Sequence, residues 1–319
     1  MSYIAPSHLA VRPATIPELA LLMDHFRQKA SAGASIDQLA GLLEPIMYGH
    51  RLMMRCLPPG TRLFRGRIVS SPPTHHREVA YPPAAVVAQG RANRAGQPVL
   101  YVTTSDNAVA FETRAAIGNM LAAVQYQVTA ELSYMALGYT KLAASRLEAT
   151  RDVPAYGLGL TTDREAFVEE FLAEIFTPLV NGPDDEWRYR ASIAVAENFF
   201  HNDLADALLF PTFSMRADGD NLAIRTRFAD RGLKAVSVSM WEKVADVAPF
   251  QVEYSYRDVS QKIGKRGEIT WHGSPAFQLT RPGEWVVLEA RDGSWHIKHH
   301  GVGDMPEGVV AQPTDEPGR

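Results

Sequence analysis

The chain has 319 residues, 46% of them hydrophobic and 21% charged, which are the proportions of a globular protein with one large or two smaller cores. Its 32 Lys and Arg residues against 36 Asp and Glu leave a net charge of -4, so no overall attraction draws it to nucleic acid or to an anionic membrane. A single cysteine excludes an internal disulfide and a cysteine-rich zinc site. Because the sequence shows neither a secretory signal nor a run of apolar residues long enough to span a bilayer, we expect a cytoplasmic protein with no membrane or nucleic-acid partner.

Residues 15–54 show the periodicity of α-helices. Thr15 stands where a helix N-cap does, two positions before a proline, and apolar residues then recur three or four positions apart. Two prolines and a glycine at 58–60 end this pattern, since they do not continue a helix. We therefore predict two or three helices that form an N-terminal cap, residues 1–57.

The next part of the chain, residues 58–245, mixes short apolar strands with helices, which is typical of an α/β protein of the α+β kind. We predict strands at 62–68, 99–103 and 122–128, a helix that starts after Ser105 or Asp106 and contains Glu112, and helices at 163–176 and 189–200. Four glutamates of the helix at 163–176 lie opposite its apolar stripe, so we expect them to face solvent: Glu165, Glu169, Glu170 and Glu174.

The C-terminal part of the chain is richer in alternating aromatic strands. Strands are predicted at 250–256, 284–290 and 294–299, with a turn at 291–293, and together they make a β extension over residues 246–303. The final stretch, 304–319, has three prolines and almost no large apolar side chain, so we expect a flexible tail.

Four short polar segments interrupt the hydrophobic background, at 63–67, 90–101, 111–114 and 210–223. In chain order, these segments contain an arginine, a tyrosine, a glutamate and a residue with a hydroxyl side chain. A pocket that cleaves a dinucleotide needs such side chains, because it must hold phosphates and stabilise a ribosyl cation. Taken singly, each residue has an ordinary explanation, such as a surface ion pair or a tyrosine at the edge of the core. Their order and spacing favour the functional interpretation.

In this order the segments resemble the RES family, which is named for its arginine, glutamate and serine, over about residues 62–241. Leu63-Phe64-Arg65-Gly66-Arg67 is similar to the strand that carries the family's arginine, which implies Arg65, with Arg67 as the competing choice. Gly90-Arg91-Ala92-Asn93 followed by Val99-Leu100-Tyr101 is similar to the second block and implies Tyr101 as the pocket tyrosine. Phe111-Glu112-Thr113-Arg114 matches the helix that carries the family's glutamate, here Glu112.

The third signature departs from the family pattern. The family usually has Tyr-Pro-Ser and, some residues later, Asn-Leu-Ala, whereas this chain has Phe210-Pro211-Thr212-Phe213-Ser214 and then Asn221-Leu222-Ala223. Either Thr212 replaces the serine in place or Ser214 supplies the hydroxyl after a local shift. Both alignments keep a hydroxyl, and both keep Asn221 as a binding residue.

The resemblance implies an ADP-ribosyltransferase-like core that binds NAD+ as its substrate and cleaves the bond between nicotinamide and ribose. Arg65 would then hold the pyrophosphate with a forked pair of hydrogen bonds, and a buried Glu112 carboxylate would stabilise the developing cation. Tyr101 would contact the nicotinamide ribose, and Ser214 or Thr212 would hold the amide or a phosphate oxygen. The family also implies a toxin with a cognate antitoxin protein as partner. A homodimer and the acceptor, water or inorganic phosphate, are left open.

Two other functions stay open at this point. One is transfer of ADP-ribose to a protein side chain, and the other is a catalytically inactive nucleotide-binding or structural module. No metal is predicted, since neighbouring histidines such as His75 and His76, or His299 and His300, point in different directions on regular structure.

Overall fold

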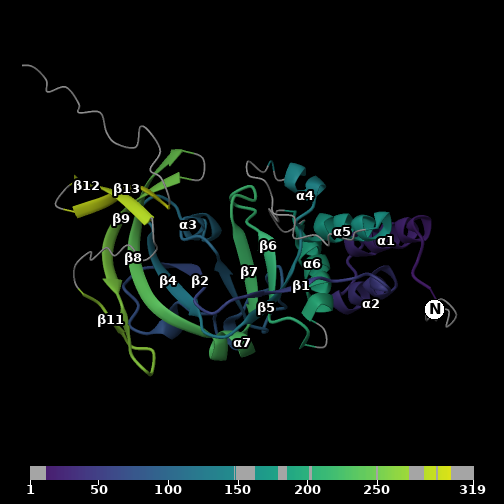
Figure 1. The fold of residues 1–319 in the computed structure, drawn as a ribbon, viewed down its shortest axis with the longest axis horizontal. Helices are drawn as coiled ribbons and strands as arrows, with labels where there is room; N and C mark the ends of the chain where they lie inside the picture. The colour runs from purple at the N-terminus through teal and green to yellow at the C-terminus, as the bar shows by residue number, and fades with distance from the viewer. Residues whose placement is uncertain are drawn as a thin grey trace, which may run out of the picture. The chain divides into compact units, whose positions relative to one another are not determined.

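The computed structural model describes residues 12–146, 148, 162–178, 185–200, 203–248, 251–272, 284–291 and 294–302 (Figure 1). The predicted tail at 304–319 lies outside these residues. The chain forms two compact units that interleave along the sequence. The first contains residues 1–63, 81–105 and 127–234, and the second contains residues 64–80, 106–126 and 235–319. The sequence-based boundaries at 57/58 and 245/246 stay predictions.

Helices of the first unit begin at clear capping signals. Helix α1 (Ile16–Ser31) follows Thr15, whose backbone N–H and hydroxyl both donate to the Glu18 carboxylate at 2.8 Å. Helix α2 (Ile36–Met47) follows Ser35, which accepts a hydrogen bond from the Gln38 backbone. These capping boxes satisfy N–H groups that have no partner inside the helix. Four further helices complete the unit: α4 (Lys141–Arg146), α5 (Asp163–Phe176), α6 (Glu186–Phe200) and α7 (Thr226–Gly232).

Among the described residues, five neighbouring strands of the sheet belong to the first unit. They are β1 (Met54–Leu57), β5 (Leu132–Ala136), β6 (Ala207–Pro211), β7 (Asp220–Arg225) and β3 (Val99–Thr103), in that spatial order. The pair β5 and β6 is parallel and the other pairs are antiparallel, so the sheet is mixed. Helix α6 lies next to α2 and α5 and contacts β6 (Figure 1). One core joins these helices to the strands through residues such as Phe26, Phe171, Phe199 and Phe210.

The second unit is built mainly from strands. The order is β2 (Arg62–Val69), β4 (Met120–Val128), β8 (Leu233–Ala248), β9 (Gln251–Ser260), β13 (Ser294–Val302) and β12 (Glu284–Arg291). Strands β10 (Lys262–Ile263) and β11 (Ile269–Thr270) form a separate pair, and α3 (Ala108–Glu112) is a one-turn helix. Phe64, Val109, Trp241 and Tyr254 belong to a core that joins β2, α3, β8 and β9. The protein is therefore a mixed α+β structure, as the sequence predicts.

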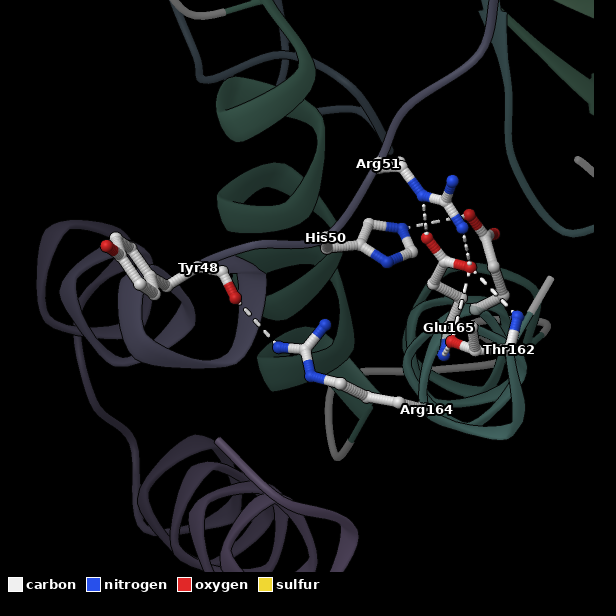
Figure 2. A network of polar contacts seen from close by, with 7 residues as sticks. Tyr48, His50, Arg51, Thr162, Arg164 and Glu165 are labelled. Carbon is white, nitrogen blue, oxygen red and sulfur yellow. Dashed lines mark hydrogen bonds and ion pairs between the residues drawn. The ribbon is translucent and has the colours of Figure 1, made fainter. Parts of the chain in front are cut away.

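The prediction that the α5 glutamates face solvent is wrong. Glu165 is buried and accepts two hydrogen bonds from the Arg51 guanidinium, while its backbone completes the cap with Thr162 (Figure 2). His50 Nε2 lies 3.0 Å from Glu169 Oε1. The other two carboxylates also have partners from other elements: Glu170 accepts from Thr140 at 2.7 Å, and Glu174 accepts from Arg27 at 2.8 Å. Helical periodicity does not show that the polar face of α5 lies against the segment between α2 and β1.

Candidate functional site

The seven candidate residues divide between the two compact units. Tyr101, Thr212, Ser214 and Asn221 belong to the first unit. Arg65, Arg67 and Glu112 belong to the second. The meeting of all seven residues in one pocket stays a prediction.

Sheet pairing brings Tyr101 and Asn221 onto neighbouring strands of the first unit. Tyr101 of β3 lies opposite Ala223 of β7, and Asn221 lies opposite Thr103 on one side and Phe210 of β6 on the other. Because side chains alternate along a strand, Tyr101 and Asn221 emerge on the same face of the sheet. Tyr101 and Asn221, which are 120 positions apart in sequence, thus lie in adjacent strands. Thr212 follows directly after β6, the strand on the other side of β7.

The Tyr101 hydroxyl fastens the loop that carries the second polar segment. It accepts a hydrogen bond from the Ala92 backbone N–H at 2.8 Å and donates one to Asn93 Oδ1 at 2.8 Å. A side chain on Gly90 would not fit, because its Cβ would lie 2.4 Å from Asn93 Oδ1 and 2.9 Å from the Tyr101 oxygen. The structure thus shows Tyr101 in a supporting role for this loop, while its contact with the nicotinamide ribose stays a prediction.

Arg91 is a central residue of this region to which the sequence analysis assigned no role. Its guanidinium donates to the carbonyl oxygens of Phe176, the last residue of α5, and of Pro178, the latter at 2.9 Å. It also lies over the Phe213 ring, 4.4 Å from the centroid. The cation thus sits at the negative end of the α5 dipole and ties the 88–94 loop to the residue that precedes Ser214. The sequence holds a signal for this residue, since Arg91 is part of the second polar segment, at 90–101.

The two candidate hydroxyls of the third signature differ in accessibility. Thr212 is 0% exposed, and its Oγ1 has no hydrogen-bond partner. Its backbone N–H donates to Gly219 O at 2.9 Å and its carbonyl accepts from Ala217 N at 2.7 Å, so both ends of the 212–219 loop are held in place. Ser214 is half-buried. Ser214 is therefore the more accessible of the two residues, whereas reaching Thr212 requires the loop to move.

Next to Asn221 lies a second residue that the sequence analysis missed. Asp220 is 9% exposed, and its Oδ1 accepts a hydrogen bond from the Tyr139 hydroxyl at 2.8 Å. Its carbonyl accepts from Thr103 Oγ1 and from the Thr104 backbone, both at 3.0 Å. These bonds fix the start of β7 against the end of β3, so they also fix Asn221.

In the second unit, the two candidate arginines leave the same face of β2. The Arg65 Nε donates to Val79 O at 3.2 Å, and an Arg67 terminal nitrogen donates to Glu78 O at 2.8 Å. Arg65 is half-buried and Arg67 is exposed. Both guanidiniums therefore lie along the segment around the short 3₁₀ turn η1 (His76–Glu78).

Glu112 is the last residue of α3 and is exposed, where the sequence analysis expected a buried carboxylate. The buried part of this one-turn helix consists of Ala108, Val109 and Ala110, so the Glu112 side chain is left exposed. The chain then turns away through Arg114, which has a left-handed φ of 53°. The N-cap of α3 is Asn107, whereas the sequence analysis expected Ser105 or Asp106.

A close contact connects the strand of the arginines to the helix of the glutamate. A Cβ at Gly66 would lie 2.2 Å from Val109 Cγ1 and 3.0 Å from Thr113 Cγ2. Glu112 is three positions after Val109 and next to Thr113, so it lies on the side of α3 near the strand. Since Arg65 and Arg67 alternate with Gly66, their side chains start on the other face of β2.

The neighbouring histidines His75 and His76 have separate partners in the structure. His76 Nε2 lies 2.9 Å from the Tyr126 hydroxyl, and the His75 ring accepts from the Arg77 backbone, so the two rings have different partners. Burial lowers the pKa of His76. Within the described ranges no three metal-binding side chains come together, and no helix there has the length and apolarity that crossing a bilayer demands. The side chains of His299 and His300 lie outside the described part.

Comparison with known proteins gives no relative: no protein-family model matches the chain, and no curated protein is significantly similar to it in sequence.

Proposed function

We propose that the chain binds NAD+ and cleaves the bond between nicotinamide and ribose, with an ADP-ribosyltransferase-like fold. The observation that carries the proposal is that the strand of Arg65 and the helix of Glu112, residues that are 47 positions apart, meet at Gly66 within one compact unit, although the Arg65 side chain starts on the face of β2 that points away from α3. Because Glu112 is exposed, substrate can reach its carboxylate without a movement of the chain.

In the proposed reaction the bond from the ribose C1′ to the nicotinamide nitrogen breaks. The electron pair stays with nicotinamide, which leaves as a neutral molecule, and positive charge develops on the ribose. Glu112 stabilises that charge more than it stabilises the ground state, which lowers the barrier. Water then adds to C1′ and releases a proton, or inorganic phosphate adds in its place. Arg65 binds a phosphate of the dinucleotide. Of the two candidate hydroxyls of the first unit, Ser214 is the more accessible, since Thr212 is fully buried.

The decisive assay measures nicotinamide release from NAD+ by the purified full chain. We expect turnover by the wild type and a loss of about 100-fold or more in kcat for Glu112→Gln, the size typical of removing one electrostatic stabiliser. Arg65→Gln should mainly raise KM, since Arg65 binds a part of the substrate that does not react. Glu131→Gln is the matched control, because Glu131 is an exposed glutamate of the first unit outside the candidate set. Equal turnover by Glu112→Gln and wild type would overturn the assigned mechanism.

Product analysis separates the remaining alternatives. Free ADP-ribose indicates water as the acceptor, and phosphorylated ADP-ribose indicates phosphate. Modified proteins in a lysate treated with NAD+ would show a protein ADP-ribosyltransferase instead. A rise in melting temperature with NAD+ but without nicotinamide release would show a binding module. If the protein is a toxin, its expression should drain cellular NAD+ and arrest growth, and co-expression of a cognate antitoxin should prevent both effects.

A further inference from the structure

We infer that Gly66 is a positioning residue for Glu112, because the missing side chain in β2 sets how closely α3 approaches the strand. The inference rests on the proposed function, in which Glu112 acts on the ribose. It adds that the catalytic geometry depends on a residue that itself touches no substrate.

Space, rather than backbone conformation, explains the glycine at this position. Gly66 is not among the glycines with a left-handed φ, so an L-residue fits its backbone. The obstacle is the distance of 2.2 Å from the position of a Cβ to Val109 Cγ1, whereas ordinary van der Waals contact begins at 3.4 Å. An alanine at this position requires one of the two elements to move by roughly 1 Å.

Val109 cannot yield by rotating its side chain. It is 1% exposed and packs in the core with Phe64, Trp241 and Tyr254. A valine in a helix also has one strongly preferred rotamer. Thr113, the second neighbour, is held by hydrogen bonds from its hydroxyl to Val109 O at 2.8 Å and Ala110 O at 3.1 Å. The strain is therefore relieved by a shift of α3 as a body.

A shift of α3 moves Glu112 with it, because the helix has only five residues and Glu112 is its last. A misplacement of about 1 Å at a reacting group can cost about 100-fold in rate. We therefore expect Gly66→Ala to lower kcat by about 100-fold while KM for NAD+ stays within about twofold, since the strand that carries Arg65 keeps its place. A raised KM with an unchanged kcat would show that the strand moved, which would overturn the inference.

A second substitution tests the steric cause directly. The double variant Gly66→Ala/Val109→Ala lacks the Val109 Cγ1 atom, which lies 2.2 Å from the position of a Cβ at residue 66. The Cβ of residue 109 remains, at an ordinary contact distance of 3.5 Å. We expect this double variant to recover at least about tenfold of the lost kcat, although Val109→Ala alone should gain nothing. Gly41→Ala is the matched control, because no atom lies within 4 Å of a Cβ at Gly41. Failure of the second substitution to restore any activity would contradict the mechanism.

Hydrogen exchange keeps this test separate from the proposed function. The α3 amides should exchange faster in Gly66→Ala than in wild type, and should be protected again in the double variant, whether or not the protein cleaves NAD+. If the wild type releases no nicotinamide, the proposed function fails, and with it the catalytic part of this inference. If exchange of α3 is the same in all variants, Gly66 does not position the helix.

Discussion

Arg91 offers a direct test of how the candidate region of the first unit is held together. We consider Arg91→Met, which keeps an unbranched apolar stem over Phe213 but removes all five N–H donors. Each hydrogen bond from a charged donor typically contributes about 1.5–3 kcal/mol, and a cation–π contact at a partly exposed site about 0.5–1 kcal/mol. Arg91 makes two such hydrogen bonds and lies over one ring at 4.4 Å. Because the contacts share one side chain, they do not add fully.

We therefore expect Arg91→Met to lower the free energy of unfolding by about 3 kcal/mol, slightly less than the sum of the smallest values for the three contacts. Arg91→Lys should cost about half as much, since a lysine reaches one carbonyl and lacks the planar fork. Arg94→Met is the control: Arg94 is in the same loop, but its partner Asp37 is exposed and its partner Glu197 is half-buried, and such ion pairs contribute up to about 1 kcal/mol each. Urea unfolding followed by circular dichroism measures all three variants. The reasoning is refuted if Arg91→Met costs no more than Arg94→Met.

Three further predictions follow from single contacts. Arg51 and the Thr162 cap hold the pKa of Glu165 down to about 2 in the fold, below its ordinary value of 4.5. The stabilisation is thus complete above pH 4.5 and is lost as the pH falls toward 2, and urea unfolding at several pH values should show Glu165→Gln losing that dependence. Thr212→Val should raise stability by about 1 kcal/mol, because it removes a buried hydroxyl without a partner, and a lower melting temperature would contradict this. Gly138→Ala should lower stability by about 1–3 kcal/mol in calorimetry, since φ is +88° and a Cβ would lie 2.8 Å from Thr177 Cγ2, and an unchanged melting temperature would count against it.

Elements with strong local signals were predicted closely. Helix α5 has the predicted bounds, Asp163–Phe176, because Thr162 caps it and its apolar stripe has the helical period. Strand β3 also has its predicted bounds, Val99–Thr103. Helix α3 was predicted, but its cap was not, since three polar residues in a row each qualify as an N-cap.

The candidate residues were easier to name than to place. Sequence order identified Glu112 and Thr212, but the expected buried carboxylate is exposed and the Thr212 hydroxyl is enclosed by its own loop. Arg91 lies in one of the four polar segments of the sequence, yet its partners at the end of α5 are 85 and 87 positions away. Accessibility and pairing of this kind depend on segments that are distant in sequence, so local patterns do not predict them.

By itself the sequence determined the α+β character of this protein and the elements with strong local signals, such as α5 and β3, because caps, turns and hydrophobic periods are properties of a few neighbouring residues. Only the tertiary structure decided that the α5 glutamates have partners, that Ser214 is more accessible than Thr212, and that α3 lies directly on Gly66. The physical reason is that burial and close packing arise where segments far apart in the chain come into contact.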